Sequence, residues 1–215
     1  MKNFKVILAL LSVVSLMLSF TACASKSTEE EPASETKGVS SADKVSYGFE
    51  GSLENWCIST WESETESELG CTNVAISTDQ KASGSSSAAV TCDFKENNES
   101  AKTTKGAFKI NYDNPINLKG KLLTAKVFIP EELVSEKFKS APIGVKLYIK
   151  TTKNYSWSDG GSIDIANTLK PGWNEISFAP IDVNESDTRE IGIQITKAGG
   201  SPGWNGTIYI DDVSY

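Results

Sequence analysis

Residues 143–150 read Ile-Gly-Val-Lys-Leu-Tyr-Ile-Lys, and residues 190–196 read Glu-Ile-Gly-Ile-Gln-Ile-Thr. In both stretches an aliphatic side chain occupies every second position. Successive side chains of a β-strand point to opposite faces, so the alternation predicts two strands with one apolar face each. A third stretch repeats the pattern with Leu123, Ala125, Val127 and Ile129. We predict that these apolar faces form the core and that the opposite faces of the strands are available for binding.

From Val45 onward the chain consists of short runs rich in β-branched and aromatic residues, separated by Gly, Pro, Asn, Asp and Ser. We predict strands over residues 45–49, 56–60, 74–78, 87–94, 107–110, 122–129, 143–150, 162–165, 173–178, 190–196 and 207–213. One short helix is predicted over residues 130–138, where Pro130 comes first and acids fill the first turn. The predicted fold class is all-β, a two-sheet antiparallel β-sandwich, with a barrel as the alternative.

The amino-terminal segment has the character of an export signal. Lys2 and Lys5 precede an apolar run over residues 6–20, and small residues follow before Cys23. The run is shorter than the ~20 residues that a membrane-spanning helix needs, so we predict a signal peptide over residues 1–22. Ser, Thr, Glu, Pro and Lys dominate the next segment, which cannot bury enough apolar area to fold. We therefore predict a flexible tether over residues 23–44 and a folded domain over residues 45–215.

The sequence Phe20-Thr21-Ala22-Cys23 resembles the lipobox of bacterial lipoproteins. That resemblance implies that Cys23 becomes the mature amino terminus and carries a diacylglyceryl thioether. Acyl chains such as palmitate would then anchor the protein to the membrane. The location that follows is the bacterial cell envelope, outside the cytoplasm. Ordinary cleavage after Ala22, which would produce a secreted protein, is the alternative.

The charge balance and the missing residue types exclude several functions. The 215 residues include 28 acidic and 21 basic side chains, with a net charge of -7 and no histidine. Arg189 is the single arginine, so the clustered positive charge that nucleic-acid binding requires is absent from the sequence. Without histidine there is no Ser-His or Cys-His nucleophile and no HExxH zinc site. The function must rest on carboxylates, aromatic rings, amides or oxygen-bound cations.

Three cysteines follow Cys23: Cys57, Cys71 and Cys92. An odd number outside the cytoplasm implies one disulfide and one thiol, or no disulfide at all. Cys57 and Cys71 flank the predicted loop of residues 58–70, so we favour that pair over Cys71 with Cys92. The cysteines show no CxxC spacing, and a metal cluster is therefore not predicted.

Several local patterns follow one another in a fixed order. They are Tyr47-Gly48-Phe49-Glu50-Gly51 with Trp56, the Ser-Gly turn of residues 79–87, Pro171-Gly172-Trp173, the strand 190–195 and Tyr209-Ile210-Asp211-Asp212-Val213. This order resembles the jelly-roll carbohydrate-binding modules attached to bacterial xylanases, cellulases and mannanases. Residues 145–151, followed by Tyr155-Ser156-Trp157, look most like the modules found beside mannanases. The resemblance implies non-catalytic binding of β-mannan, xylan or β-glucan at the cell surface.

The resemblance also implies a structural Ca²⁺ ion. Carried onto this chain, carboxylate ligands would come from Glu50 and Asp211, and the turn that contains Asp79 and Ser83 would add mainly backbone carbonyls. A hard cation of this kind takes six to eight oxygen ligands and would neutralise acids from opposite ends of the chain. The alternation of the last strand places Asp211 outside the core stripe. A solvated acidic pair, Asp211 and Asp212, is the alternative.

A sugar-binding surface needs aromatic rings that stack on C–H faces and polar groups that bind hydroxyls. The aromatic candidates are Trp61, Tyr148, Tyr155, Trp157 and Trp204. The candidates for hydroxyl contacts are Gln194, Lys146 and Lys150. Tyr155 and Trp157 stand out because they lie two residues apart in a polar stretch that we predict to be a loop. Trp56 and Trp173 adjoin predicted strands, and we expect both to cover the core.

Two other classes of function stay open. A jelly-roll glycosidase needs only two carboxylates, and the acids of the late strands that could face a cleft are Glu175 and Asp164. A surface lipoprotein with an adhesive or structural role is the other class. The reading that we favour is a non-enzymatic monomer. Its expected partners are a polysaccharide or oligosaccharide, the membrane through the lipid anchor, and a glycoside hydrolase or sugar transporter that uses the bound glycan; nucleic acid is not among them.

Overall fold

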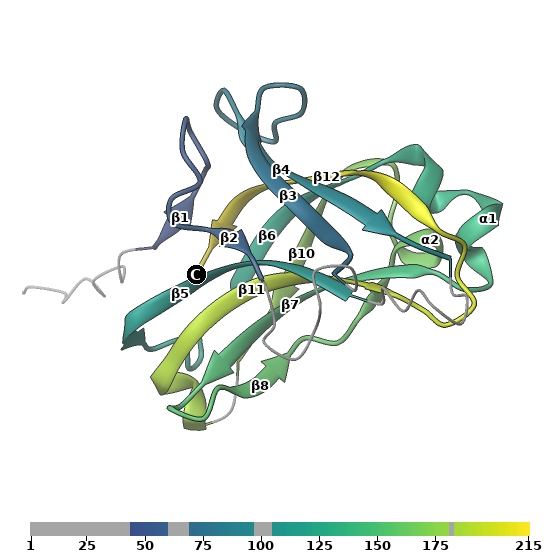
Figure 1. Ribbon diagram of the computed structural model, residues 1–215. Helices are drawn as coiled ribbons and strands as arrows, with labels where there is room; N and C mark the ends of the chain where they lie inside the picture. Colours follow the sequence, from purple (N-terminus) through teal and green to yellow (C-terminus); the bar gives the residue numbers. More distant parts are fainter. Residues whose placement is uncertain (1–43, 60–68, 97–104, 181–182) are drawn as a thin grey trace, which may run out of the picture. The chain divides into compact units, whose positions relative to one another are not determined.

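The computed structural model describes residues 44–59, 69–96, 105–180 and 183–215. The predicted signal peptide, Cys23, most of the predicted tether and Trp61 lie outside the described residues. The described strands form two antiparallel sheets that pack face to face (Figure 1). The predicted all-β sandwich is therefore confirmed.

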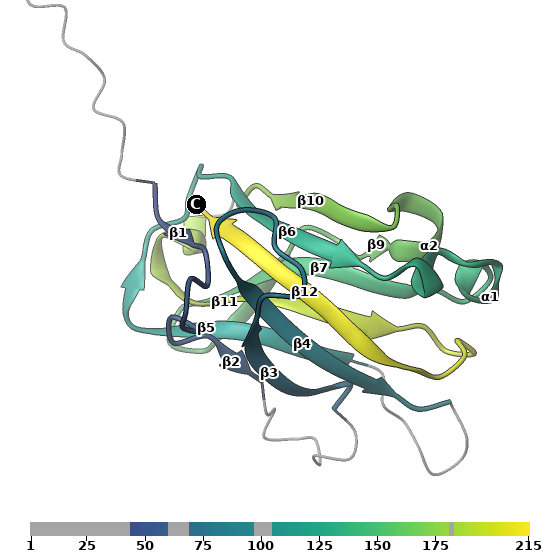
Figure 2. The ribbon, with the colours of Figure 1, turned by 90° about the horizontal axis from the view of Figure 1, so that it is seen from above.

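Sheet A contains β1 (Ser46–Tyr47), β3 (Cys71–Ser77), β4 (Ser87–Phe94), β6 (Leu123–Ile129), β10 (Gly172–Phe178) and β12 (Trp204–Ser214). Its strand order is β10-β6-β12-β4-β3, with β1 also paired to β12. Figure 2 shows these strands side by side across one layer. The sheet thus joins strands from the beginning, the middle and the end of the domain, as in a jelly roll.

Sheet B contains β2 (Cys57–Ile58), β5 (Lys105–Ile116), β7 (Ile143–Thr151), β8 (Ser156–Asp159), β9 (Ile163–Asp164) and β11 (Thr188–Lys197). Its order is β2-β5-β11-β7-β8, with β9 also paired to β7. The two predicted strands with the clearest alternation, β7 and β11, are neighbours at the centre of this sheet.

The core lies between the two sheets, where the alternating aliphatic residues of each sheet meet. In β7 and β11 the buried inward residues are Val145, Leu147, Ile149, Ile191, Ile193 and Ile195. The inward residues of β6 are Leu123, Ala125, Val127 and Ile129. Each predicted run has a strand in the structure, although β1, β2 and β9 contain only two residues. Strand β8, which lies in the stretch predicted as a loop, was missed.

Helical structure is limited to short segments in the described part of the chain. The predicted helix over residues 130–138 is two pieces, the 3-10 turn η2 (Glu131–Val134) and α1 (Glu136–Lys139), separated by Ser135 in extended conformation. The other segments are α2 (Ile165–Thr168) and the 3-10 turn η3 (Val183–Asp187). None of the described helices is long and apolar enough to span a bilayer.

The two ends of the domain meet beside β12. The backbone N–H of Val45 donates to the carbonyl of Tyr215, and the N–H of Tyr215 donates back to Val45, both at 3.1 Å. The strand β12 is irregular near its end, because its register with β6 shifts between Asp211 and Ser214 and Asp212 has a φ of 47°. Asp211 lies before the irregularity, on the face opposite to the buried Ile208 and Ile210, as the alternation predicts, and the irregularity returns Val213 to the core.

Candidate functional site

The outward side chains of sheet B form the surface that we take as the candidate site. Cross-strand register places Trp157 beside Lys150, Lys150 beside Glu190, and Glu190 beside Asn111. The neighbouring row is Asp159, Tyr148, Gly192 and Lys109. Both rows cross the strands β8, β7, β11 and β5, so residues far apart in the sequence form one continuous face.

Trp157 is the exposed aromatic residue of this face. Its ring stacks on the ring of Tyr148, with centroids 4.1 Å apart and planes 11° apart. Tyr148 lies against Gly192, where a Cβ atom would stand 2.3 Å from the Tyr148 ring carbon Cε1. The order outward from the sheet is therefore Gly192, Tyr148 and Trp157. Tyr148 is fully buried, whereas Trp157 is 41% exposed, so Trp157 is the ring that a ligand can reach.

Asp159 fixes the orientation of the Trp157 indole. The indole Nε1–H donates to Asp159 Oδ2 at 2.5 Å, and the Lys146 ammonium lies 2.7 Å from the same oxygen. Burial acts to raise the pKa of Asp159, but the hydrogen bonds from Lys146, Trp157 and the N–H of Gly161 outweigh it and lower the pKa. An ionised carboxylate thus holds the indole at neutral pH. The Lys146 ammonium also lies 5.2 Å from the centre of the Trp157 ring.

We call the stacked pair of Tyr148 and Trp157 the platform. Glu190 connects this platform to the rest of the face through its hydrogen bond and ion pairs. Its Oε1 accepts a hydrogen bond from the Tyr148 hydroxyl at 2.8 Å and pairs with the Lys150 ammonium at 3.0 Å. Its Oε2 pairs with the Lys109 ammonium at 3.1 Å. Burial raises the pKa of Tyr148 well above its usual value, so the hydroxyl stays protonated as a donor. The buried carboxylate is compensated on both oxygens, as a stable buried charge requires.

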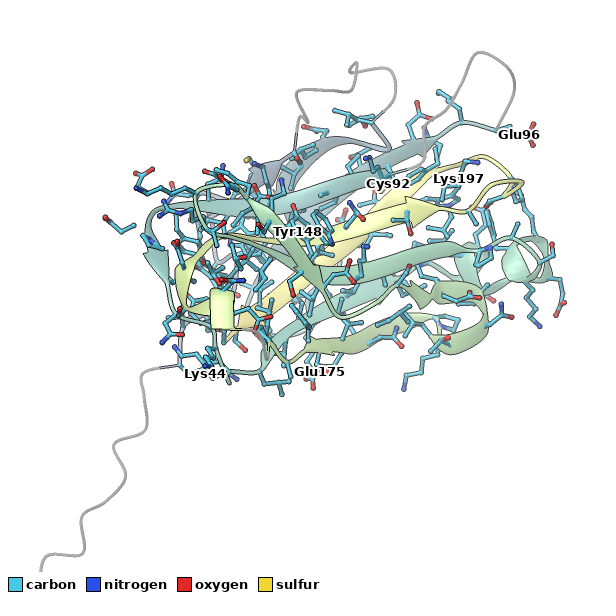
Figure 3. All side chains as sticks on the ribbon, turned by 90° about the horizontal axis from the view of Figure 1, so that it is seen from below. Lys44, Cys92, Glu96, Tyr148, Glu175 and Lys197 are labelled. Carbon is cyan, nitrogen blue, oxygen red and sulfur yellow. The ribbon has the colours of Figure 1, made fainter. Side chains whose placement is uncertain are left out.

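Sequence reasoning missed Glu190 as a residue of the site. It considered Glu175 and Asp164 instead, and neither lies in the cluster around Trp157. Glu175 pairs with Lys126 in sheet A, and Asp164 accepts a hydrogen bond from the N–H of Asn167 at the start of α2. Figure 3 labels Tyr148 and Glu175 on different sheets. The available signal was the alternation of β11, which places Glu190 on the same face as Gln194.

The other predicted residues are distributed unevenly around the platform. Lys146, Lys150 and Gln194 lie on the outward side of sheet B, as predicted. The Gln194 side chain makes no hydrogen bond to another described residue, although it is largely buried. Tyr155 is 51% exposed in the turn that leads into β8. Gln194 is the amide of this group; it lies opposite Lys146 and is 6% exposed.

Three aromatic predictions need correction. Trp204 is only 4% exposed and belongs to the core, where its Nε1–H donates to Glu132 Oε2 at 3.2 Å, so it cannot stack on a ligand. Tyr148 supports Trp157 from below and cannot itself present a face to a sugar. Trp56 is buried in the core as expected. Trp173 does not cover the core: it is partly buried and lies opposite Phe128, on the outward face of sheet A, where the two rings meet edge-to-face.

The predicted Cys57–Cys71 disulfide is wrong for this structure. All three described cysteines are free thiols. Cys57 is exposed on β2 of sheet B, whereas Cys71 is buried on β3 of sheet A. The residue opposite Cys71 is Cys92 on β4. Proximity in the sequence was misleading because the chain crosses between the sheets between residues 57 and 71.

The turn between β3 and β4 brings together most of the predicted Ca²⁺ ligands. Asp211 Oδ2 accepts hydrogen bonds from the N–H groups of Ala82 and Ser83, at 2.9 and 3.2 Å. Glu50 accepts hydrogen bonds from the N–H and the hydroxyl of Ser85. The two carboxylates fit a hard cation. The donors that face them do not, because the turn directs N–H and hydroxyl groups at them where a cation needs carbonyl oxygens.

The pKa values of the two carboxylates that contact this turn are shifted in opposite directions. Burial raises the pKa of Asp211, although the N–H groups that donate to it act in the opposite direction. The hydrogen bonds from Ser85 lower the pKa of Glu50, which is exposed. Asp79, the remaining predicted ligand, is exposed and acts on Tyr209, whose pKa is raised first by burial and then by the Asp79 charge. No group of three or more acidic or cysteine ligands suited to a metal ion occurs within the described residues.

The family of the chain follows from its match to a family model. A family model described as "Mannanase, galactose-binding domain-like" matches residues 47–212. The chain belongs to this family. The match begins in β1 and ends in β12, so the mannanase galactose-binding-like domain spans both sheets and includes Trp157, Glu190 and the turn that holds Asp211. The predicted relationship to the modules of mannanases is confirmed. No curated protein matches the chain.

Solved structures show the same fold at low sequence identity. The CBM27-1 module of Caldicellulosiruptor saccharolyticus, solved in complex with mannohexaose, is 20% identical with a TM-score of 0.57, over 81% of this chain and 97% of that one. A structure from the β-sandwich superfamily of carbohydrate-binding modules, described as promiscuous in specificity, is 21% identical with a TM-score of 0.50. That match covers 78% of this chain and 59% of the other. The xylan-binding module CBM15 is 12% identical with a TM-score of 0.50, over 80% and 94%.

Proposed function

We propose that this mannanase galactose-binding-like domain binds a plant-type polysaccharide without cleaving it, through the outer face of sheet B, and that β-mannan is the preferred ligand. The observation that carries the proposal is the exposed Trp157 ring, supported from below by Tyr148 and oriented by Asp159. An aromatic ring fixed parallel to its support loses little entropy when a sugar ring stacks on it. The family and the mannohexaose complex of CBM27-1 support β-mannan over xylan and β-glucan.

The polar residues around Trp157 supply the second half of sugar recognition. Lys146, Asp159 and Gln194 surround the platform with an ammonium, a carboxylate and an amide. Sugar hydroxyls both donate and accept hydrogen bonds, so this combination can satisfy them on either side of a stacked ring. The same groups fix the orientation of the ligand, whereas the stacking contributes affinity.

The chemistry of the acids on this face supports binding over hydrolysis. A glycosidase needs one carboxyl that stays protonated, and thus a raised pKa, beside a second carboxylate. The pKa of Asp159 is lowered, and Glu190 is held between two ammonium groups. Both acids therefore serve as hydrogen-bond acceptors that position neighbouring side chains.

The proposal is tested by calorimetric titration of the full chain, purified in a non-glycosidic detergent, with mannohexaose, xylohexaose and cellohexaose. We expect the tightest binding for mannohexaose. Trp157→Ala should weaken it about tenfold or more, the equivalent of roughly 1.4 kcal/mol, while the fold is kept. Leu122→Ala, which removes an exposed apolar side chain next to β6, is the matched control.

Three outcomes would overturn parts of this proposal. Absence of binding to all three oligosaccharides by the folded protein would exclude the glycan-binding function and favour an adhesive or structural role. Release of reducing ends from mannan would replace binding with catalysis. Unchanged binding by Trp157→Ala would show that the platform lies elsewhere.

The anchoring of the domain is a separate part of the proposal. Lipidation of Cys23 after removal of residues 1–22 would hold the domain at the bacterial cell envelope, where it would present glycans to a glycoside hydrolase or a transporter. The support is the lipobox-like sequence before Cys23. Mass spectrometry of the amino-terminal peptide should find a diacylglyceryl group, and Cys23→Ser should abolish it. An unmodified peptide beginning at Cys23 would indicate a secreted protein instead.

The Ca²⁺ site also stays a proposal, supported by the two carboxylates that approach one turn from opposite ends of the chain. Thermal melting in CaCl₂, MgCl₂ and EDTA tests it. A melting temperature raised by Ca²⁺ alone, and insensitive to Ca²⁺ in Asp211→Asn, would support the ion. Identical melting in Ca²⁺ and EDTA would show that hydrogen bonds from the turn are sufficient.

A further inference from the structure

A cavity of about 630 Å³ lies along β5, at the edge of sheet B that is opposite to the edge carrying Trp157. It is lined by Tyr47, Glu54, Asn55 and residues 110–114 of β5. Strand β2 pairs with β5 only at Phe108 and Lys109, so the cavity forms where β5 continues beyond its edge partner. Three of its eight lining residues carry amides: Asn55, Asn111 and Asn114.

The cavity is connected to the aromatic platform by one row of side chains. The row starts at Trp157 on β8, crosses Lys150 and Glu190, and ends at Asn111, which lines the cavity. Three interstrand spacings separate the ends of the row, a distance of about 14 Å. The contacts along it are continuous, because Lys109 bridges Glu190, at 3.1 Å, and Asn111 Oδ1, at 3.3 Å.

The loop on the other side of the cavity is held in a strained conformation. Glu54 and Asn55 have φ values of 50° and 68°, in the left-handed region that non-glycine residues seldom occupy. The Glu54 carboxylate accepts a hydrogen bond from the N–H of Phe49 at 3.0 Å, and this contact stabilises the loop with Glu54 at this position. Glu54 and Asn55 are the central residues of a turn that the N–H of Trp56 closes by donating to the carbonyl of Leu53 at 2.7 Å. This turn places Asn55, which is exposed, in the lining of the cavity.

We propose that this cavity is a second sugar subsite, which binds hydroxyl groups of the same hexopyranose chain that stacks on Trp157. The proposal rests on the function proposed above and adds a direction to it: the glycan crosses the strands of sheet B, from Trp157 over Glu190 to the amides of Asn55, Asn111 and Asn114. Amides suit this role because each offers both donors and acceptors to hydroxyl groups.

The experiment compares long and short ligands in the full chain in detergent. Asn55→Gly removes the amide and keeps the left-handed backbone, which glycine adopts without strain. Asn114→Ala removes a second amide, on β5 instead of the loop. Each variant should weaken mannohexaose binding several-fold and leave mannobiose binding unchanged, whereas Trp157→Ala should weaken both. Asn73→Ala, at an exposed position of sheet A, is the matched control.

The outcomes separate this inference from the proposed function. If the wild-type protein and both asparagine variants bind mannohexaose equally, the cavity is not a subsite, and Asn55 serves only the geometry of its loop. If the variants lose affinity for mannobiose and mannohexaose alike, the two-subsite arrangement is wrong. If the wild-type protein binds neither ligand, the proposed function itself fails.

A second inference follows independently from the pair Cys71 and Cys92. The two residues lie directly opposite each other on β3 and β4, with their Sγ atoms 4.0 Å apart. The N–H of Asp93 donates to the carbonyl of Gly70 at 2.7 Å, which makes Cys71 and Cys92 a non-hydrogen-bonded pair. Cα atoms approach to about 4.5 Å in such pairs, within the range that a disulfide accepts.

We infer that Cys71 and Cys92 form a disulfide when the chain folds in the presence of a disulfide oxidant. One thiolate attacks the oxidant and forms a mixed disulfide, and the second thiolate displaces the reduced oxidant thiol. Two protein thiols are thereby oxidised, and one oxidant disulfide is reduced to two thiols. Both side chains are buried in the folded protein, so the reaction must precede their burial.

The test is refolding of the full chain carrying Cys23→Ser, in detergent, with a glutathione and glutathione disulfide mixture. Alkylation after denaturation should label Cys57 alone, and a linked Cys71–Cys92 peptide should lack the mass of two hydrogens. Cys57→Ser should retain the link, and Cys71→Ser should lose it. Three alkylated thiols, or a link that includes Cys57, would overturn the inference.

Discussion

Gly192 decides whether the aromatic platform can form. Its missing side chain leaves the space that the Tyr148 ring occupies, and Tyr148 in turn supports Trp157. The glycine has no unusual φ, so its role is one of space and not of backbone conformation. A buried glycine in a central strand weakens the sheet by itself, and its presence here serves the close approach of the ring.

Gly192→Ala should therefore destabilise the domain and weaken glycan binding together. The added methyl group would displace Tyr148, at a cost of about 1–3 kcal/mol for overpacking of this kind. Thermal melting measures the loss of stability, and calorimetric titration with mannohexaose measures the loss of binding. Gly199→Ala, where a Cβ atom meets nothing within 4 Å, should leave both unchanged. Equal melting of the two variants would contradict the layered arrangement.

Asp159 gives the platform a defined pH dependence. Its pKa in the folded protein lies below the unfolded value, so the stabilisation is fully present above the unfolded value of about 4. It is lost as the pH falls through the folded value, when Asp159 takes up a proton and releases Lys146. Trp157 fluorescence and mannohexaose affinity should change together in acid. Asp159→Asn should remove that transition; an unchanged transition would assign it to another carboxyl.

At the scale of single elements, the strands with clear alternation could be predicted from the sequence. The limits of β4, Ser87–Phe94, coincide with the prediction, and β6 and β7 differ from it by one residue at one end. Strand β8 could not be predicted because Ser-Trp-Ser-Asp places no aliphatic residue in alternation. Its strand conformation comes from pairing with β7, a tertiary effect that local propensity does not contain.

The candidate site was predictable in part for the same reason. Lys146, Lys150 and Gln194 could be assigned to an outward face because they alternate with aliphatic residues on long strands. Trp204 was misassigned because the sequence does not show that β12 begins at this residue and directs it inward. The layered support of Trp157 could not be foreseen, since it depends on the register between β7, β8 and β11.

The turn between β3 and β4 acts as a connector between distant strands. Asp211→Asn should destabilise the domain by about 1–3 kcal/mol, because an amide nitrogen would face N–H groups that now donate to a carboxylate. The expected fall in melting temperature is roughly 2–4 °C per kcal/mol for a domain of this size. Asp113→Asn, at an exposed position of β5, is the control. A melting temperature equal to that of the control would show that the turn closes without Asp211.

At the scale of the whole domain, the two sheets have different roles. Sheet A joins the first and last strands and holds the turn with Asp211, whereas sheet B presents the outward rows that contain Trp157 and Glu190. Because the roles are separate, loss of the platform should lower the affinity for glycan without unfolding the domain. The same separation explains why Trp173, on sheet A, can be an ordinary packing residue despite its size.

The pairing of Val45 with Tyr215 allows a test of the whole topology. A circular permutant that joins these residues by a short linker and opens at Gly199–Gly200, between β11 and β12, should fold and bind mannohexaose like the parent. The opening lies in a turn where neither glycine has a close neighbour for an added Cβ atom. Circular dichroism and calorimetry check the result. A permutant that fails to fold would show that β12 must follow β11 directly along the chain.

The same pairing means that the chain enters and leaves the sandwich at one place. A host protein could accept the domain within a surface loop, since the insertion would hold the two ends of the loop barely farther apart than two paired strands. The orientation of the proposed glycan-binding face relative to the host would then be set by the two junctions. Such a domain is a part that can be added to other proteins, as an internal insertion as readily as at an end.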